Sequence, residues 1–448
     1  MKLMIIGAGR IGIYLGKMLV ADDHDVTVID ADPAQVRYAT DHLDAMVLEG
    51  NGASPELLLT AGLKNMEMLI AVTGNDEINI MACMIAAKAG VAIKVARLRN
   101  LEYSAPDCVL QKEYLGIDYI IHPEVETARE LVWLIRRASA TDVIELEGGK
   151  IQLIGLRIDA QAPSLNQNLH SISQVHPGLL FRVVAINRNN RTIIPTGEDY
   201  IRKGDQIFFI AESANVAKIL SVFGKADEKL ENLMILGGGR VGRMVAEELE
   251  KDKDLNIKLI ESNREKSVKI ADQLKRTLLI LGDGTDLDLL AAEGIMDMDG
   301  FLAVTADEEN NIISCLMAKH LGVRRTFALI NRSDYLPLMQ SIGLDAAVDL
   351  QMITANTILR FIRRGNIVSV ASFPGIDAEL LEVKVTDRAK VLNKPIKHIT
   401  LPKDCIIGLI SREQEIIVPV GDSILRSGDK LMIFALPTAI QGIAKALQ

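Results

Sequence analysis

The feature that most constrains this sequence is that its second half repeats its first. The stretch LMIIGAGRIGIYLGKML, which begins at Leu3, returns as LMILGGGRVGRMVAEEL from Leu233. Likewise, AVTGNDEINI returns as AVTADEENNI, and IIPTGEDYIRKGD returns as IIVPVGDSILRSGD. A period of about 230 residues indicates a duplication of whole domains, because solenoid repeats are only about 20–50 residues long.

Each half divides in turn into a larger N-type domain and a smaller C-type domain. Polar or glycine-bearing stretches interrupt the periodic patterns near residues 140, 230 and 366. A chain of 448 residues also exceeds the size that one hydrophobic core supports. We therefore expect four domains, and their ranges are 1–140, 141–230, 231–365 and 366–448.

The charge pattern excludes some classes of partner. The net charge is −9 at pH 7, with acidic and basic residues interspersed, so no basic face for nucleic acid is expected. No apolar run approaches the roughly 18 residues that span a bilayer. The apolar start turns at Gly7, too early for a secretory signal. These patterns are typical of a cytoplasmic protein.

The N-type domain alternates short apolar runs with helical patterns. In the first copy we expect strands at about 2–6, 25–30, 44–48, 67–72, 92–97 and 118–121. Helices fit between them at 10–21 and 76–89, and an apolar helix at 124–138 can pack against another element or subunit. Strands that are apolar on both faces indicate a parallel sheet covered by helices. The expected fold is α/β, with a doubly wound Rossmann sheet in each half.

The C-type domain has a different pattern. Residues 142–212 are rich in short strands with turn signals between them, and a closing helix is expected at 213–223. Such a segment of strands with one or two helices predicts a small α+β domain in each half.

A glycine-rich motif follows the first strand and opens the first helix. The first glycine permits the tight turn, the second lets backbone approach phosphate, and the third lets helix and strand pack closely. Asp30 ends the second strand, where a carboxylate binds a ribose diol and repels a 2′-phosphate, so we expect NAD(H) rather than NADP. The motif comprises Gly7, Ala8, Gly9, Arg10, Ile11 and Gly12.

The second half repeats this motif, with Glu261 at the end of the matching strand. Because two copies of the motif occur in the same context, nucleotide binding is favoured over a glycine turn without a ligand. The alternative is that one of the two sites is degenerate. The arginine within each motif can reach phosphate or cap a ligand of a neighbouring subunit, or it can be a surface residue. The second motif comprises Gly237, Gly238, Gly239, Arg240, Val241 and Gly242.

Other candidates lie where strands end, since strand carboxyl ends line the cofactor crevice. Asn51 and Asp283 can contact ribose or turn the chain. Arg97 ends the fifth strand of the first copy and is a candidate phosphate partner, whereas Leu329 occupies the matching place. The two sites are therefore not chemically equal. The fourth strands contribute Thr73 with Gly74, and Thr305 with Ala306.

The sequence shows no recognisable set of catalytic residues. A dehydrogenase needs a proton donor or acceptor beside the nicotinamide, and no histidine recurs in both halves. His122 is the best single candidate, but capping or packing explains it better. The four scattered cysteines form no metal or redox motif, and Cys83 and Cys315 occupy equivalent packing places. We expect a regulatory protein without catalytic or metal residues, with a soluble NAD-dependent oxidoreductase as the alternative.

These motifs and their N-C-N-C order resemble the regulator-of-K⁺-conductance family over essentially the whole chain. The resemblance implies a peripheral, cytoplasmic regulatory subunit at the inner face of the membrane. It implies control of a TrkH-like integral membrane potassium-translocating subunit by NAD(H), or by ATP or ADP. It also implies a homotetrameric or dimeric gating ring. One site would include the first glycine motif, Asp30, Thr73 and Arg97; the other would include the second motif, Glu261 and Thr305.

Overall fold

The computed structural model of the chain forms two compact units, one of residues 1–127 and 349–361 and the other of residues 128–348 and 362–448. The boundaries expected near 140 and 366 fall outside the described residues, and the one near 230 precedes the first strand of the second half. The structure describes all residues except 106, 137–140, 190, 226–228, 333–334, 336–338, 340–341, 363–366, 373–375, 377, 388, 390, 414 and 448.

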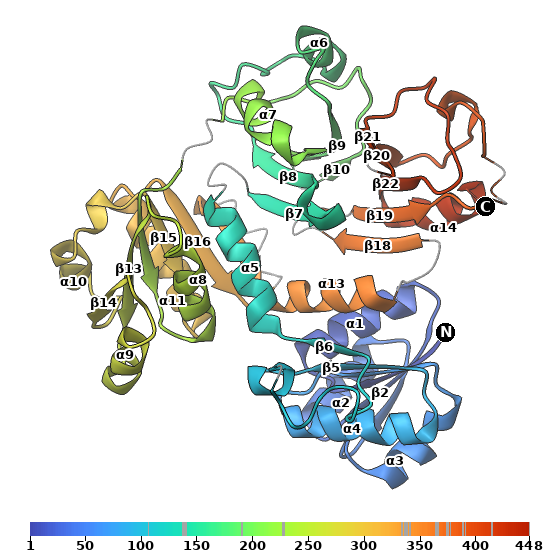
Figure 1. Cartoon of the computed structure of the whole chain (residues 1–448), viewed down its shortest axis with the longest axis vertical. Helices are drawn as coiled ribbons and strands as arrows, with labels where there is room; N and C mark the ends of the chain where they lie inside the picture. Colours follow the sequence, from blue (N-terminus) through green and yellow to red (C-terminus); the bar gives the residue numbers. More distant parts are fainter. Residues whose placement is uncertain are drawn as a thin grey trace. The chain divides into compact units, whose positions relative to one another are not determined.

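The first compact unit is built on a six-stranded parallel sheet in the order β3-β2-β1-β4-β5-β6, coloured blue to cyan in Figure 1. This is the doubly wound order, and it confirms the predicted fold class. Its strands are β1 (Lys2–Ile6), β2 (Asp25–Asp30), β3 (Met46–Glu49), β4 (Met68–Ala71), β5 (Ile93–Arg97) and β6 (Tyr119–Ile121). Its helices include α1 (Arg10–Ala21), α2 (Pro33–His42), α3 (Pro55–Thr60) and α4 (Asp76–Ala89).

The central strands β1, β2 and β4 were predictable because most of their residues are apolar and are buried in the sheet. The predicted range of the third strand was wrong by two residues at its start. Helix α2 ends at His42, so Leu43, Asp44 and Ala45 connect this helix to β3, which begins at Met46.

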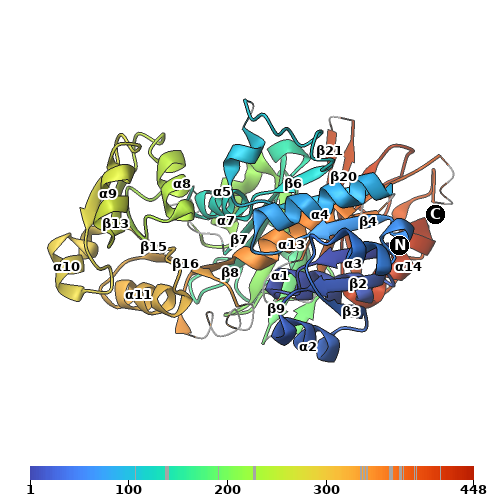
Figure 2. The ribbon, with the colours of Figure 1, turned by 90° about the horizontal axis from the view of Figure 1, so that it is seen from below.

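A helix from the second half also belongs to the first compact unit. Helix α13 (Leu350–Ile362) clusters with residues 1–127. The ring of Phe361 stacks on Tyr119 of β6, with ring centroids 4.6 Å apart. Figures 1 and 2 both show α13 in orange beside the blue elements. The sequence pattern did not predict this placement.

The second compact unit contains a parallel sheet with the same strand order, β14-β13-β12-β15-β16-β17. Its strands are β12 (Asn232–Leu236), β13 (Asn256–Glu261), β14 (Leu278–Leu281), β15 (Gly300–Ala303), β16 (Arg325–Ile330) and β17 (Ala346–Asp349). Its helices include α8 (Arg240–Leu249), α9 (Arg264–Ala271), α10 (Leu287–Ala292) and α11 (Glu308–His320).

Helix α5 (Pro123–Arg136) begins in the first compact unit and continues into the second from Ala128. Its last described residue, Arg136, forms ion pairs with Asp252 at 2.9 Å and with Glu248 at 3.6 Å. The predicted helix reached 138, and residues 137–138 lie outside the described part of the chain.

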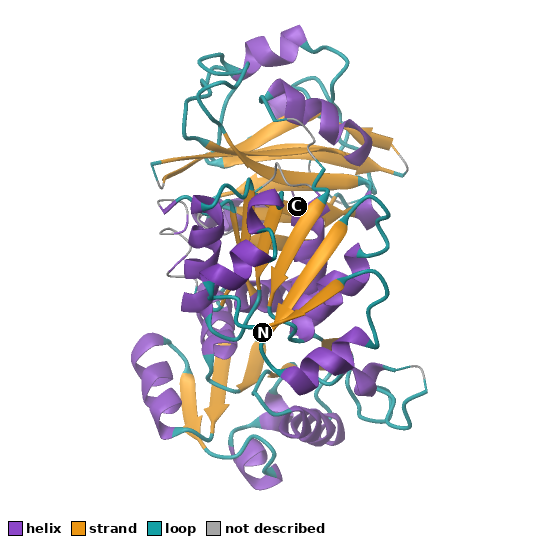
Figure 3. Ribbon diagram, turned by 90° about the vertical axis from the view of Figure 1, so that its left-hand side faces the viewer, coloured by secondary structure: helices purple, strands orange, loops and turns teal. Residues whose placement is uncertain are grey.

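The two C-type domains are five-stranded antiparallel sheets, drawn in orange with the other strands in Figure 3. The order in the first is β10-β9-β11-β8-β7, and the order in the second is β18-β19-β22-β20-β21. The strands are β7 (Asp142–Leu146), β8 (Ile151–Arg157), β9 (Phe181–Arg188), β10 (Arg191–Ile193), β11 (Gln206–Glu212), β18 (Ile367–Ser372), β19 (Glu379–Lys384), β20 (Cys405–Arg412), β21 (Glu415–Ile417) and β22 (Lys430–Ala435). The helices are α6 (Leu169–Val175), α7 (Val216–Val222) and α14 (Pro437–Leu447).

The two C-type sheets share one hydrophobic core. Leu153 and Phe208 of the first domain belong to the same buried cluster as Leu409 and Met432 of the second. Both domains also repeat an ion pair between a partly exposed arginine and a buried aspartate: Arg188 with Asp205 at 2.7 Å, and Arg412 with Asp429 at 2.8 Å.

Gly408 makes room for this shared core. A Cβ atom placed on Gly408 would lie 3.0 Å from Cγ1 of Val184 and 2.8 Å from Cγ2 of Ile210. Val184 and Gly408 occupy equivalent positions in β9 and β20, so a branched side chain in one domain fills the space left open in the other.

In the part of the chain that the structure describes, no helix is long and apolar enough to span a membrane.

Candidate functional site

The first and third glycines of both motifs are required by the backbone. Gly7 and Gly237 have φ angles of +107° and +108°, in the region that favours glycine. A Cβ atom on Gly12 would lie 1.8 Å from the carbonyl oxygen of Gly7, and one on Gly242 would lie 2.0 Å from that of Gly237. Both turns therefore bring the helix start against the preceding strand, as a phosphate-binding loop requires.

The second glycine leaves the start of the helix open. Gly9 and Gly239 are the N-caps of α1 and α8, and neither helix has a side-chain cap. A Cβ atom on either glycine would meet no other heavy atom within 4 Å. By contrast, six other helices of these N-type domains are capped by side chains: Asp32, Ser54, Asn75, Asn263, Asp286 and Asp307. The first-turn N–H groups of α1 and α8 and the helix dipole thus suit an anion.

The ribose-binding candidates Asp30 and Glu261 lie next to these loops. Asp30 accepts hydrogen bonds from the N–H of Ala8 at 2.5 Å and of Asp32 at 2.8 Å. Glu261 accepts the equivalent bonds from Gly238 at 3.1 Å and from Asn263 at 2.8 Å. A carboxylate has about four acceptor positions, so each acid keeps capacity for the hydroxyl groups of a ribose.

In the structure, the side chains of Asn51 and Asp283 accept hydrogen bonds that stabilise turns. The Oδ1 atom of Asn51 accepts the N–H of Ala53 at 2.9 Å. Asp283 accepts both the N–H and the hydroxyl of Thr285, and these bonds lower the pKa of its carboxyl group. Turning the chain is therefore a role of both residues, and their contact with ribose stays a prediction.

A buried asparagine that the sequence analysis missed organises the loop after β4. Asn79 accepts hydrogen bonds from the N–H and the hydroxyl of Thr73, and its Nδ2 donates to the carbonyl groups of Thr73 and Arg97. Asn311 makes the same contacts with Thr305 and Leu329 in the second half. An asparagine six residues after the threonine in both copies was the overlooked signal. Gly74 and Ala306 are exposed in the two loops.

Arg97 is a partly buried cation beside the first loop. Its Nη1 donates to the carbonyl oxygen of Thr73 at 3.0 Å, and its buried Nε has no hydrogen-bond partner among the residues that the structure describes. Burial lowers the pKa of its guanidinium, against the opposing effect of Glu124. A partly desolvated guanidinium with an unused donor suits an anionic ligand. Leu329, at the matching position, is buried.

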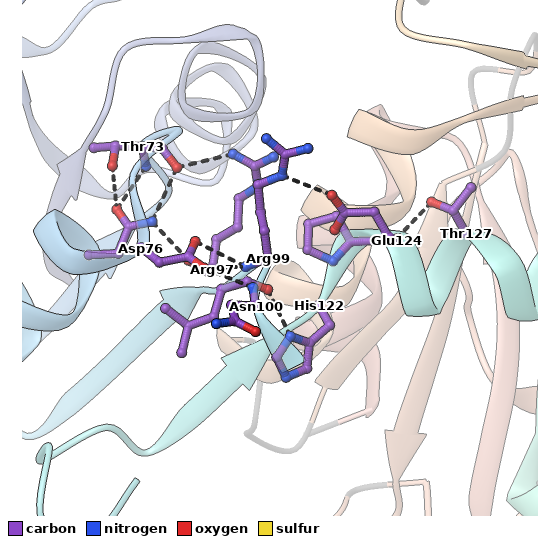
Figure 4. A network of polar contacts seen from close by, with 11 residues as sticks. Thr73, Asp76, Arg97, Arg99, Asn100, His122, Glu124 and Thr127 are labelled. Atoms are coloured by element: carbon purple, nitrogen blue, oxygen red, sulfur yellow. Dashed lines mark hydrogen bonds and ion pairs between the residues drawn. The ribbon is translucent and has the colours of Figure 1, made fainter. Parts of the chain in front are cut away.

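Figure 4 shows how the end of β5 is held around Arg97. Asp76 of α4 accepts the backbone N–H groups of Arg99 and Asn100, and the Arg99 side chain pairs with Glu124 of α5 at 2.9 Å. The end of β5 is therefore attached to the first turns of both α4 and α5.

The second half makes a different attachment. Glu308, which replaces Asp76, accepts the N–H of Asn331 at 2.7 Å and pairs with Arg332 at 3.1 Å. Both of these bonds end on α11, the helix that follows β15. The strand end of the second site is thus tied to α11, as that of the first site is tied to α4, and in the first site the pair of Arg99 with Glu124 adds an attachment to α5.

The remaining candidates have simpler environments. Both ring nitrogens of His122 are engaged, one with the carbonyl group of Leu98 and the other with the hydroxyl of Ser104, each at 2.7 Å. This supports the packing role expected for His122. Arg10 and Arg240 are exposed at the helix starts, and Ile11 and Val241 are buried beneath them. Within the described residues no cluster of side chains could hold a metal ion.

Comparison with known proteins gives a family for the whole chain. Residues 3–123 and 233–350 match the TrkA-N domain, and residues 156–224 and 380–448 match the TrkA-C domain. The Trk system potassium uptake protein TrkA of Azorhizobium caulinodans is 34% identical over 447 residues, which cover 99% of this chain and 98% of that protein. A TrkA homolog of Methanosarcina mazei is 34% identical over 453 residues, with 99% of each chain covered.

Solved structures give the same fold. The GsuK RCK domain aligns with a TM-score of 0.62 at 18% identity and covers 99% of this chain and 94% of that one. The GsuK channel bound to NAD aligns with a TM-score of 0.62 at 17% identity and covers 99% of this chain and 78% of that one. From the domain matches and the full-length relatives, the chain belongs to the TrkA family of Trk system potassium uptake proteins.

Proposed function

We propose that this chain regulates potassium uptake by binding NAD(H) at the two glycine loops, with ATP or ADP as competing ligands. The observation that carries the proposal is the pair of uncapped helix starts at Gly9 and Gly239, each beside a carboxylate that ends the second strand. Phosphate would supply the missing cap, and the acid would bind the ribose diol. GsuK structures are described as bound to NAD and to ADP, which supports the ligand class.

The two sites would hold phosphate differently. In the first site, Arg97 adds a cation with an unused Nε donor to the helix start. In the second site, Leu329 is uncharged, so phosphate at this helix start would lack the cation that Arg97 supplies in the first site. We propose that the first site is the tighter one for the more highly charged ligands, ATP and ADP.

The partner in this proposal is a TrkH-like integral membrane protein, and the regulatory unit is a ring of several copies of this chain. The family membership supports a role in potassium uptake. A ligand shifts a conformational equilibrium only through its different affinity for the two states. We therefore expect nucleotide to change the affinity of the chain for its membrane partner, without being consumed.

The test uses the space that the structure leaves open at the second glycine. Gly9→Ala and Gly239→Ala place a methyl group where no protein atom lies within 4 Å, so folding is preserved while phosphate loses its approach. Calorimetry with NADH, ATP and ADP should show loss of one site in each single variant and of both sites in the double variant. Gly178→Ala, at an exposed glycine in a C-type domain that also has no neighbour within 4 Å, is the matched control.

Two outcomes would contradict the proposal. One is wild-type affinity in the double variant, which would place the nucleotide elsewhere. The other is steady oxidation of NADH with carbonyl compounds, which would indicate an oxidoreductase instead. Pull-down from membranes with and without NADH then identifies the integral partner.

A further inference from the structure

The residue after the first glycine differs between the two motifs, and so does the acid that it contacts. The first site combines Ala8 with Asp30, and the second combines Gly238 with Glu261. In both sites the N–H of this loop residue donates to the carboxylate. The backbone contact is thus the same, although the acid of the second site is longer by one methylene group.

The longer acid occupies the space of the missing methyl group. A Cβ atom on Gly238 would lie 2.8 Å from Oε2 of Glu261 and 3.2 Å from its Cβ. Both distances are shorter than ordinary van der Waals contacts. In the first site the methyl group of Ala8 is fully buried, so the equivalent volume is filled from the loop and not from the acid.

The second helix of each N-type domain is adjusted in the same way. A Cβ atom on Gly238 would also lie 2.6 Å from Cδ1 of Ile270 in α9. The equivalent residue of α2 is Ala39, which is fully buried. The first site therefore places a methyl group on the loop and a short side chain on the helix, and the second site places no side chain on the loop and a long one on the helix.

We propose that Ala8 with Asp30, and Gly238 with Glu261, are matched pairs in which the loop residue determines which acid can bind the ribose. Asp30 is partly exposed, whereas Glu261 is 8% exposed, so each pair also sets how deeply its carboxylate lies. An acid of the wrong length would lose its bond to the loop N–H or be displaced from the ribose. This inference rests on the proposed nucleotide binding, and it names the positions that set ribose recognition in each site.

The binding test exchanges the pair in the first site. Asp30→Glu alone places a longer acid against the Ala8 methyl group and should weaken NADH binding at that site about tenfold, the equivalent of one lost hydrogen bond. Ala8→Gly added to Asp30→Glu should restore the affinity to within a few-fold of wild type. Wild-type affinity in the single variant, or no recovery in the double variant, would overturn the pairing.

The stability test needs no nucleotide and uses the second site. Gly238→Ala should lower the thermal unfolding temperature of the ligand-free protein, and Glu261→Asp with Ile270→Ala should restore part of the loss. Gly239→Ala is the matched control, because its Cβ atom would meet nothing within 4 Å. An unchanged unfolding temperature in Gly238→Ala would overturn the pairing. If no form of the protein bound NADH, the proposed function would fail, while this test would still decide the steric part.

Discussion

The two N-type domains hold the end of their fourth strand with the same hydrogen bonds and differ in the cations around it. Asn79 and Asn311 bind the same backbone groups in the two copies. The first copy has Arg97 at the end of its fifth strand, where the second copy has Leu329. Arg99 of the first copy pairs with α5, and Arg332 of the second copy pairs with α11. Duplication thus preserved the scaffold of the site while its charges changed. A site can therefore keep its ligand class and lose part of its affinity.

The largest expected effect comes from exchanging the residue that ends the fifth strand. Arg97→Leu should weaken ADP binding at the first site about 10- to 100-fold, since a hydrogen bond to a charged group contributes about 1.5–3 kcal/mol. The measurement is calorimetric titration of a form in which Gly239→Ala has removed the second site. Lys150→Leu, a charge loss in a C-type domain, serves as the control. Equal affinity of Arg97→Leu and wild type would show that the cation does not distinguish the sites.

The C-type domains provide a comparison of packing. Gly408→Val places a branched side chain against Val184 and should destabilise the protein by about 1–3 kcal/mol, the usual cost of overpacking a core. Adding Val184→Gly moves the side chain from one domain to the other and should recover most of the stability. Denaturant unfolding of the single and double variants measures this. Additive losses in the double variant would mean that the two positions do not compensate for each other.

A smaller effect is expected where the strand ends are attached. Glu124→Gln should raise amide hydrogen exchange in the first turn of α5 and cost below about 1 kcal/mol, because half of the Arg99 side chain is exposed. In the second half, Arg332→Ala should instead raise exchange at the start of α11. Unchanged exchange at the start of α11 in Arg332→Ala would contradict the attachment proposed for the second half.

The smallest effect concerns the equivalent cysteines. Burial raises the pKa of Cys83 to about 12 and raises the pKa of Cys315 further, and both side chains are inaccessible. We expect neither thiol to react with a water-soluble reagent at pH 8 in the folded protein, while both react after unfolding. Mass spectrometry of the labelled protein identifies the sites. Labelling of only one of them in the native state would show that the two domains open to different extents.

Much of this structure could be predicted because its signals are local. Apolar runs such as Leu3 to Ile6 identify central parallel strands, and the glycine motifs fix a turn whose geometry no other residue permits. The acids at Asp30 and Glu261 follow from their distance along the chain. These features need only residues that are close in sequence or repeated.

The rest depended on contacts between distant segments. The bond from Ala8 to Asp30 and the pair of Arg99 with Glu124 arise only when separate strands end at the same edge of the sheet. The role of Asn79 was missed because a buried amide within a helix resembles any polar helix residue. The stacking of Phe361 on Tyr119 joins residues that are more than 200 positions apart, and no periodicity reports such a contact.

The placement of α13 in the first compact unit has a consequence for protein engineering. A chain cut near residue 230 would yield an amino-terminal piece that lacks one of its own structural helices, and the apolar surface around Tyr119 would lose its cover. Each half carries a complete set of motifs, yet the first compact unit includes a helix that comes from the second half. Deletion studies should therefore be designed around residues 349–361 rather than around the midpoint of the sequence.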